Sequence, residues 1–515
     1  MKKPNAGKEL YQQLRRLPWQ TLWDQEVPRF DRAGAAERER RVAVVRAVGV
    51  VFSESGPSEQ GDAVRGWLRG LLADPVEKVR RYAMNALPKV GSGRHEESGL
   101  LALLDKTKSE REKKFLAGAL DKIGSEQTLG AAVRLPQGTE QKVRAAMVRN
   151  AGPGSLRMDR IVEDFEGLEI CLRGRRGLEE LVKEEVLTAG ASKFRCLSQT
   201  GGLNVIAPVA PFSLSDLYRL RCFGTAGFFL GTTCPGAEAG VIAGPLARSL
   251  FQTLTEGPAR YRLDFVSKGH QRAAVRNLAN RVYALCPEIL NDPRQALWAV
   301  DIHSTEFGER VELRPRLVPD PRFSYRRQYL PAASHPPLAA AMARLAGVME
   351  DEVVWDPFCG SGVELIECAL RGGVRTLLGT DLSAEALGSA RCNYAAAGVP
   401  VAEARFVCCD FRNHASVEGL EPGRVSLVIT NPPLGMRVPI PDLRHLIADL
   451  FSAAATVLRP GGRLVFINPL RQDSPHPLLR MESRRLVDMS GFDCRMEVYR
   501  KIESPRTGTP GRTGA

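Results

Sequence analysis

The residues best suited to chemistry lie in the last third of the chain, at the ends of short apolar runs. The run Asp-Pro-Phe-Cys-Gly-Ser-Gly at 356–362 leads into a helical pattern, and its glycines let a ligand lie against the backbone. Asp381 ends the next apolar run, about twenty residues later, where a carboxylate can accept both hydroxyls of a ribose. Asp410 ends a third run, and Asn-Pro-Pro at 431–433 follows a fourth. This spacing predicts a site for a nucleoside-containing ligand.

A parallel sheet is needed to bring these residues together. Buried strands are expected at 353–355, 376–381, 404–410, 425–430 and, after a turn at 458–462, at 463–467. Ligands of open α/β sheets bind at the carboxyl ends of the strands, where the polar residues stand. A Rossmann dehydrogenase would share the glycine turn and the first acid. It would not need the Asn-Pro-Pro turn, and 356–362 is not its usual glycine fingerprint.

The first part of the chain has a helical spacing of apolar residues instead of short apolar runs. Between residues 38 and 160, apolar residues recur at steps of three and four, which predicts helices that resemble HEAT-type repeats. Several cations of this region could line a concave binding face, although a solvated helix surface is the favoured interpretation. These cations are Arg80, Arg81, Lys113 and Lys114. Beyond Pro153, strand and helix patterns alternate, which predicts an α+β region.

The length, composition and net charge of the chain limit the class of protein. The chain has 515 residues, 43% of them hydrophobic, and a formal net charge of +13. Its length predicts about three domains, and the positive charge favours nucleic acid as a partner, although a generally basic protein gives the same signal. No apolar run suits a membrane span or a signal peptide, so we expect a cytoplasmic protein. The 11 cysteines show no C-x-x-C spacing, so we expect free thiols and no metal.

The run at 356–362, taken with Asn-Pro-Pro-Leu-Gly at 431–435, resembles the RNA methyltransferases that carry a THUMP domain and methylate the N2 amine of guanosine. The helix pattern at 177–186 and the segment 323–327, which leads to His335-Pro336, also fit that family. The likeness covers about two thirds of the chain, and the helical repeats lie outside it.

The resemblance implies a multidomain α and α/β protein. Together with the helical pattern and the Pro-, Gly- and Thr-rich end, it gives four expected domains: 1–155, HEAT-like helical repeats; 156–330, a ferredoxin-like plus THUMP RNA-binding region of α+β type; 331–503, a Rossmann-like class I methyltransferase with a seven-stranded mixed sheet; and 504–515, a disordered tail. It also implies S-adenosylmethionine as cofactor and structured RNA as substrate. Transfer RNA is preferred, with large-subunit ribosomal RNA close behind. The helical repeats would bind a protein partner, and no membrane or metal is expected.

By the same resemblance, Asp381 would hold the ribose of the cofactor, Asp410 its adenine amine and Asp356 its methionine amino group. The implied cofactor-binding residues are Asp356, Phe358, Cys359, Gly360, Ser361, Gly362, Asp381, Leu382, Asp410, Phe411 and Asn431. The implied RNA-binding residues are Arg272, Arg276, Arg326 and Arg327, for which surface solubility is an equal alternative.

The implied catalytic residues are Asn431, Pro432, Pro433 and Leu434. A purine amine is a poor nucleophile because its lone pair is delocalised into the ring. The Asn431 oxygen and the Pro432 carbonyl can each accept one N–H bond and hold the amine as the sulfonium methyl arrives. The family usually has an aromatic residue where this chain has Leu434. Either another aromatic stacks on the base, or base capture is weaker, or the substrate differs.

Two other functions stay open at this point. The Asn-Pro-Pro turn suits any planar amine or amide, so DNA adenine or a protein amide is an alternative acceptor. A catalytically weak RNA-binding scaffold with a degenerate methyltransferase fold is the other alternative. The intact acids and glycines of the predicted site count against the scaffold.

Overall fold

The computed structural model of the chain describes residues 6–91, 94–131, 135, 138–150, 154–266, 269, 271–330, 333–435, 440–470, 473 and 476–503. The tail predicted at 504–515 lies outside these residues. Contacts divide the chain into two compact units. One comprises 1–154 with 257–260 and 279–290, and the other comprises the rest. Within the described ranges, no helix has both the length and the apolar character that crossing a bilayer requires.

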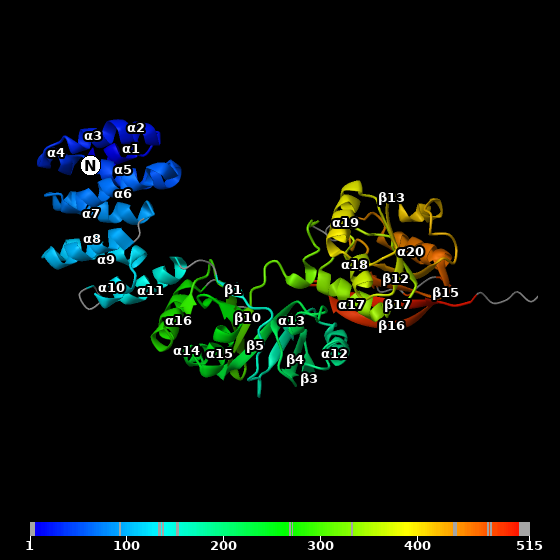
Figure 1. Cartoon of the computed structure of the whole chain (residues 1–515). Coiled ribbons are helices and arrows are strands. Elements are labelled where there is room, and N and C mark those ends of the chain that lie inside the picture. Colours follow the sequence, from blue (N-terminus) through cyan, green and yellow to red (C-terminus); the bar gives the residue numbers. More distant parts are fainter. Residues whose placement is uncertain are drawn as a thin grey trace, which may run out of the picture. The chain divides into compact units, whose positions relative to one another are not determined.

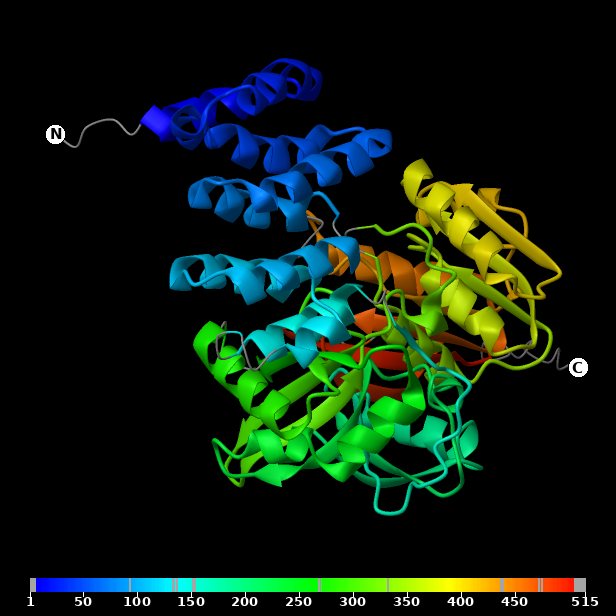
Figure 2. The ribbon, with the colours of Figure 1, turned by 60° about the vertical axis from the view of Figure 1, so that its left-hand side comes forward.

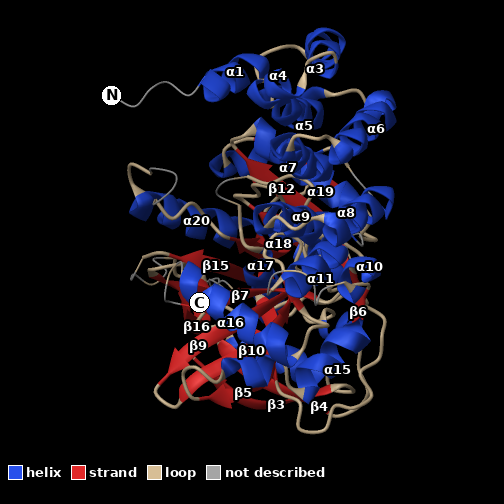
Figure 3. Ribbon diagram, turned by 90° about the vertical axis from the view of Figure 1, so that its left-hand side faces the viewer, coloured by secondary structure: helices blue, strands red, loops and turns tan. Residues whose placement is uncertain are grey.

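The first unit is built from helices that stack in succession, as the blue and cyan ribbons of Figure 2 show. They are α1 (Ala6–Leu14), α2 (Trp19–Thr21), α3 (Val27–Asp31), α4 (Ala35–Arg40), α5 (Ala43–Ser55), α6 (Gly61–Gly70), α7 (Glu77–Ala86), α8 (Arg94–Lys106), α9 (Glu110–Ile123), α10 (Glu126–Gly130) and α11 (Thr139–Asn150). A Cβ on Gly49 would lie 2.7 Å from the Cβ of Ala86, so this glycine lets α5 and α7 pack closely. The predicted helical N-terminal region is therefore confirmed, and Figure 3 shows it in blue.

Three cations of the predicted binding face make ion pairs within this unit. Arg80 pairs with the buried Glu112, with Nε 2.6 Å from Oε1. Arg81 pairs with Glu77 one turn earlier, and Lys113 pairs with Glu110. These three cations are therefore matched by acids of the same unit and do not form a free basic face. Arg80 and Arg81 are half-buried, so they are also less solvated than the expected helix surface.

The second unit begins with a sheet of eight strands in the order β3-β4-β2-β5-β10-β9-β7-β8. The strands are β2 (Ile170–Arg173), β3 (Phe194–Thr200), β4 (Leu203–Pro208), β5 (Thr225–Thr233), β7 (Arg260–Val266), β8 (Leu290–Asn291), β9 (Trp298–Thr305) and β10 (Gly308–Pro315), while β1 (Ser155–Leu156) pairs separately with β6 (Thr255–Glu256). The helices are α12 (Glu179–Thr188), α13 (Leu214–Leu217), α14 (Glu238–Ile242), α15 (Pro245–Leu254) and α16 (Arg272–Leu285). Residues 279–285 of α16, with Arg260 of β7 and Leu290 of β8, are counted with the first unit. Strands and helices alternate here as predicted.

The second sheet of this unit has seven strands in the order β13-β12-β11-β14-β15-β17-β16. The strands are β11 (Glu352–Asp356), β12 (Val374–Asp381), β13 (Glu403–Cys408), β14 (Val425–Thr430), β15 (Leu458–Asn468), β16 (Leu479–Asp488) and β17 (Asp493–Lys501). The first five are parallel, and β17 and β16 are antiparallel additions. The predicted seven-stranded mixed sheet is confirmed (Figure 1).

One local prediction in this sheet was incomplete. The turn expected at 458–462 is part of β15, because Leu458 already pairs with Val425. The register then shifts, so that Leu427 pairs with Arg463. Gly461, at φ +76°, lets the extra residues of β15 form this irregularity without leaving the sheet.

Helices cover both faces of the seven-stranded sheet. Figure 1 shows α18 (Val363–Leu370) and α19 (Ala384–Ala397) on one side and α20 (Leu443–Val457) on the other. Alternate residues of β11 decide which face meets which helix, since Val353 and Trp355 share a core cluster with α20. On the other side, α17 (Pro336–Ala346) and α18 contribute to a separate cluster. Burial on both faces explains why β11 and β14 are continuous apolar runs.

Candidate cofactor and substrate site

The glycine turn joins β11 to α18 and is fastened to the neighbouring strand β12. Gly360 and Gly362 have φ of +52° and +79°, which L side chains rarely adopt. A Cβ on Gly362 would lie 3.2 Å from the Cβ of Ala390 on α19, so a side chain there would crowd that helix. The Gly360 N–H donates to Oδ2 of Asp381 at 2.8 Å. The predicted turn and the predicted ribose-binding acid therefore meet in space.

The acids of the next two strand ends stand at the same edge. Asp381 is half-buried and its Oδ1 accepts the Ser383 N–H at 2.9 Å. Asp410, after the adjacent strand β13, accepts the Arg412 N–H and forms an ion pair with that side chain at 2.9 Å. Leu382 is 75% exposed. These strand ends offer carboxylate oxygens to a ligand lying along the edge.

The predicted cofactor-binding residues also include two aromatic side chains and a cysteine. The rings of Phe358 and Phe411 lie 4.8 Å apart, centroid to centroid. Cys359 is buried, and burial raises the pKa of its thiol well above the ordinary value, so the reactive thiolate is disfavoured at neutral pH. All eleven cysteines are free. Among the described residues, no group of three or more His, Cys, Asp or Glu side chains could hold a metal ion.

Asp356 is a fully buried carboxyl with one free oxygen. Its Oδ1 accepts the Thr430 hydroxyl at 2.6 Å and the Phe358 N–H at 3.0 Å. Its Oδ2 is buried and has no hydrogen-bond partner among the described residues. Burial, with a further contribution from the charge of Glu364, raises the pKa of Asp356 well above its usual range.

Three more oxygen atoms near the glycine turn are buried and lack a hydrogen-bond partner among the described residues. Ser361 Oγ, Glu364 Oε1 and Asn431 Oδ1 also meet no hydrogen-bond partner within the described part of the chain. A buried polar atom without a partner is costly, and two of the four belong to carboxyl groups. This cluster is therefore suited to a ligand that carries positive charge and N–H donors.

Asn431 lies beside the glycine turn, at the carboxyl end of β14. That strand is hydrogen-bonded to β11, and the Thr430 bond to Asp356 ties the two strand ends together. The Asn431 Nδ2 donates to the Ser334 hydroxyl at 2.9 Å, which leaves Oδ1 as a free acceptor. Pro432 is buried, and Pro433 and Leu434 are half-buried. The structure thus places the predicted catalytic residues next to the predicted cofactor turn.

The four predicted RNA-binding arginines lie on two separate elements. Arg272 and Arg276 are exposed on α16. Arg326 and Arg327 belong to the segment that leads into the methyltransferase-like sheet, and Arg327 is exposed. The Arg326 guanidinium lies 4.7 Å from the ring centroid of Tyr329, which is 64% exposed. An exposed ring next to a cation is suited to stacking on a nucleic-acid base.

Three residues that the sequence prediction did not name lie beside the candidate site residues. Asn393 on α19 donates to the carbonyls of Ser361, at 3.1 Å, and Gln328, at 3.2 Å. Ser334 contacts Asn431, and Glu364 is buried on α18. Glu364 could have been found from the sequence, because a glutamate is unusual in the otherwise apolar first turn of α18. Nothing local marks Ser334 or Asn393, because their partners are distant in the sequence.

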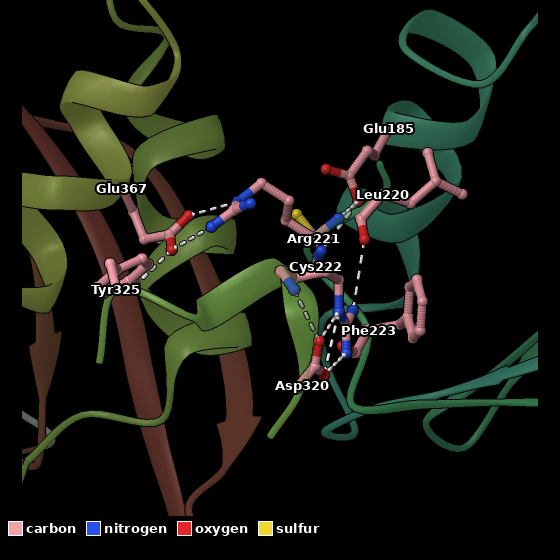
Figure 4. A network of polar contacts seen from close by, with 9 residues as sticks. Glu185, Leu220, Arg221, Cys222, Phe223, Asp320, Tyr325 and Glu367 are labelled. Carbon is pink, nitrogen blue, oxygen red and sulfur yellow. Dashed lines mark hydrogen bonds and ion pairs between the residues drawn. The ribbon is translucent and has the colours of Figure 1, made fainter. Parts of the chain in front are cut away.

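A polar network links the eight-stranded part of the unit to α18 (Figure 4). Arg221 donates to both oxygens of Glu367, at 2.9 and 2.8 Å, and the Tyr325 hydroxyl donates to the same carboxylate at 2.6 Å. Glu185 accepts the backbone N–H groups of Arg221 and Cys222. Because α18 begins at the glycine turn, this network connects that turn with the preceding α+β region.

Comparison with known proteins identifies the type of domain. Residues 324–492 match the family model described as UPF0020, RMKL-like, methyltransferase domain. The tRNA (guanine(6)-N2)-methyltransferase of Thermus thermophilus is 30% identical over 210 residues, which are 39% of this chain and 59% of that protein. The tRNA (guanine(10)-N2)-dimethyltransferase of Methanocaldococcus jannaschii is 28% identical over 225 residues, 41% of this chain and 60% of that protein.

The two sequence matches leave part of each relative uncovered. The chain spans about three fifths of the length of these curated relatives. Among solved structures, TrmN from Thermus thermophilus aligns over 65% of this chain and all of that one, with 23% identity and a TM-score of 0.52, which shows a shared fold. Residues 324–492 are therefore similar to the methyltransferase domain that this family model describes.

Proposed function

We propose that the chain is an S-adenosylmethionine-dependent methyltransferase that methylates the N2 amine of guanosine in structured RNA, transfer RNA first and large-subunit ribosomal RNA second. One observation carries the proposal. Asn431 Oδ1 is a buried acceptor that meets no partner among the residues the structure describes, at the strand edge that also holds the glycine turn. The methyltransferase domain match and the activities for which the two tRNA methyltransferase relatives are named support the same reaction.

The residues at this edge fit the proposed cofactor. S-adenosylmethionine carries an ammonium and a sulfonium, and the unpartnered oxygens of Asp356 and Glu364 are suited to a cation with N–H donors. Asp381 would accept the ribose hydroxyls, and Asp410 the adenine amine. When bound, the cofactor supplies the electrophilic methyl group.

Asn431 and Pro432 would hold the acceptor amine. The Asn431 oxygen and the Pro432 carbonyl each accept one N–H bond, so the nitrogen lone pair points at the methyl carbon. As the new N–C bond forms, the S–C bond breaks and the sulfonium becomes a neutral thioether. The positively charged nitrogen is acidic and loses its proton to water, so no strong general base is needed.

The remaining regions would bind and orient the RNA. Residues 156–330 are proposed as the ferredoxin-like and THUMP module, which would contact phosphates and RNA shape. Arg272, Arg276 and Arg327 are the proposed contacts, and Tyr329 with Arg326 would stack on a base in place of the family aromatic that Leu434 replaces. Residues 1–155 are proposed as HEAT-like repeats that carry a protein partner.

The assay for this function uses the full chain, tritiated S-adenosylmethionine and total RNA. We expect label that ribonuclease releases and that co-elutes with N2-methylguanosine after digestion to nucleosides. Parallel reactions with DNA and with protein test the other acceptor classes. Label confined to DNA or protein would overturn the RNA assignment. No label in any acceptor, with cofactor binding intact, would overturn the enzyme.

Asp381→Ala should weaken cofactor binding by about 1.5–3 kcal/mol, or about 10- to 150-fold in Kd, because a charged acceptor of hydrogen bonds is lost. Isothermal titration calorimetry with S-adenosylmethionine measures the change. Glu385→Ala, on the exposed first turn of α19, is the matched control and should bind as wild type. An unchanged Kd in a folded Asp381→Ala protein would remove this residue from the cofactor site.

A further inference from the structure

A buried asparagine of α19 joins two loops that are far apart in the sequence. Asn393 is 0% exposed. Its Nδ2 donates to the carbonyl of Ser361, in the glycine turn, at 3.1 Å and to the carbonyl of Gln328 at 3.2 Å. Its Oδ1 accepts the Gln328 N–H at 3.0 Å. Both N–H bonds and the oxygen of this amide are therefore engaged by backbone groups.

The orientation of the Asn393 amide is fixed by its partners. Two of its bonds go to the N–H and the carbonyl of the same residue, Gln328, as in a hydrogen-bonded pair of antiparallel strands. Reversing the amide would place two donors together and two acceptors together. The Ser389 hydroxyl, on the preceding turn of α19, adds a bond to Oε1 of Gln328 at 2.9 Å. Gln328 is thus held at its backbone and at its side chain by α19.

The same part of α19 packs against the glycine turn. Ala390 lies between Ser389 and Asn393, and a Cβ added to Gly362 would lie 3.2 Å from the Ala390 Cβ. Asn393 adds the hydrogen bond to the Ser361 carbonyl. One helix therefore contacts both the turn proposed to hold the cofactor and the segment that contains Gln328.

Gln328 is followed directly by the aromatic residue that is proposed to stack on a base. Tyr329 is 64% exposed, and the Arg326 guanidinium lies 4.7 Å from its ring centroid. We call these two side chains the base platform. A tyrosine ring turns about only two side-chain torsions, so the backbone largely decides where it lies. Because Asn393 holds the residue before Tyr329, the position of the base platform depends on this asparagine.

We propose that Asn393 is the positioning residue that holds the base platform at a fixed distance from the glycine turn, so that the stacked base presents its amine to the methyl donor. The inference rests on the proposed function and adds this residue to it. Leu434 supplies no ring, so the stacking ring must come from another segment and be fixed there by contacts of its own. Reacting atoms must approach to about 3–3.5 Å, and a misplacement of about 1 Å costs about 100-fold in rate.

The first test is Asn393→Leu, which removes all three bonds of the amide at similar size. We expect kcat for methylation of total transfer RNA at saturating cofactor to fall about 10- to 100-fold. The Kd for S-adenosylmethionine should rise by no more than about 10-fold, because the turn loses a single hydrogen bond. In a Tyr329→Ala background the same change should lower kcat little further, because its effect passes through Tyr329. Equal losses in both backgrounds would show a structural role only and overturn the proposal.

Asn204→Leu is the matched control for removing a buried asparagine. Asn204 on β4 is 1% exposed, and its Nδ2 donates to the Glu179 carbonyl at 2.8 Å. Its loss should lower the thermal midpoint, because a buried carbonyl loses its donor, and should leave kcat unchanged below that temperature. This control separates the general cost of a lost buried amide from the placement of the base platform.

A milder pair of variants carries the test if Asn393→Leu does not fold. Gln328→Ala and Ser389→Ala remove the side-chain bond from its two ends and keep the bonds of Asn393. Each should lower kcat about 2- to 10-fold, and the double variant should be no slower than either, because both act through one contact. Full kcat in both single variants would overturn the proposal while leaving the RNA methyltransferase function in place.

A second measurement reads the base platform without any reaction. The full chain is labelled with 3-fluorotyrosine at its nine tyrosines, and the Tyr329 fluorine signal is the one missing from Tyr329→Phe. We expect one narrow Tyr329 signal in wild type and in Asn204→Leu, and a shifted or broadened signal in Asn393→Leu. An unchanged Tyr329 signal in Asn393→Leu would refute the positioning role. The expected signals in a protein that methylates no acceptor would refute the proposed function and leave the contact standing.

Discussion

Asn431→Ala is expected to lower kcat for methyl transfer about 10²- to 10³-fold, the range for losing one preorganised hydrogen-bonding group at a reacting centre. The alanine removes the oxygen that would hold the amine, and the Pro432 carbonyl alone cannot fix the direction of the nitrogen lone pair. The Kd for S-adenosylmethionine should change little, because the Asp381 carboxylate and the glycine turn remain. Single-turnover methylation of RNA, with calorimetry of cofactor binding, measures the two effects separately.

Two variants make this result specific. Asn413→Ala removes an exposed asparagine of the same domain and should leave kcat unchanged. Asn431→Asp keeps two acceptor oxygens but loses the Nδ2–H that Ser334 accepts, so it should also be impaired. If Asn431→Ala kept the wild-type kcat, the amine would be held elsewhere, and the assignment of the Asn-Pro-Pro turn would be wrong.

The strand-edge site could be predicted because each of its parts is marked locally. Continuous apolar runs identify strands buried on both faces, and the parallel order places their carboxyl ends together. Asp356, Asp381 and Asn431 follow three such runs, and the structure brings them to one edge. Knowing that strands are parallel was enough to infer proximity without knowing any contact.

The supporting contacts could not be predicted because they join segments with no local relationship. Ser334 and Asn431 are 97 positions apart, and Arg221 and Glu367 are 146 apart. Their side chains meet only after the strand order is set, and no periodicity records that order. The strand β3 carries no clear strand pattern for another reason. Its later residues are exposed, so it lacks the alternation that marks a half-buried strand.

The buried pair of Arg463 and Glu352 is expected to control the stability of the methyltransferase domain. Their side chains are 4% and 0% exposed, with Nη1 and Oε1 3.1 Å apart. Arg463 also donates to the carbonyls of Ala346 and Gly347, where α17 ends with a residue at φ +58°. Arg463→Met removes the cation and leaves Glu352 buried with its charge unmatched. We expect a loss of about 3–5 kcal/mol in the free energy of unfolding.

Pulse proteolysis of the full chain in urea measures this loss, and an exposed pair provides the matched control. Arg375 and Asp351 lie 3.0 Å apart with side chains 52% and 70% exposed, so Arg375→Met should cost about 1 kcal/mol or less. The double variant Arg463→Met with Glu352→Met removes both charges and should recover much of the stability. If it is as unstable as Arg463→Met alone, the loss comes from the α17 carbonyls. The arginine would then act chiefly as the cap that fixes α17, the helix that follows Ser334.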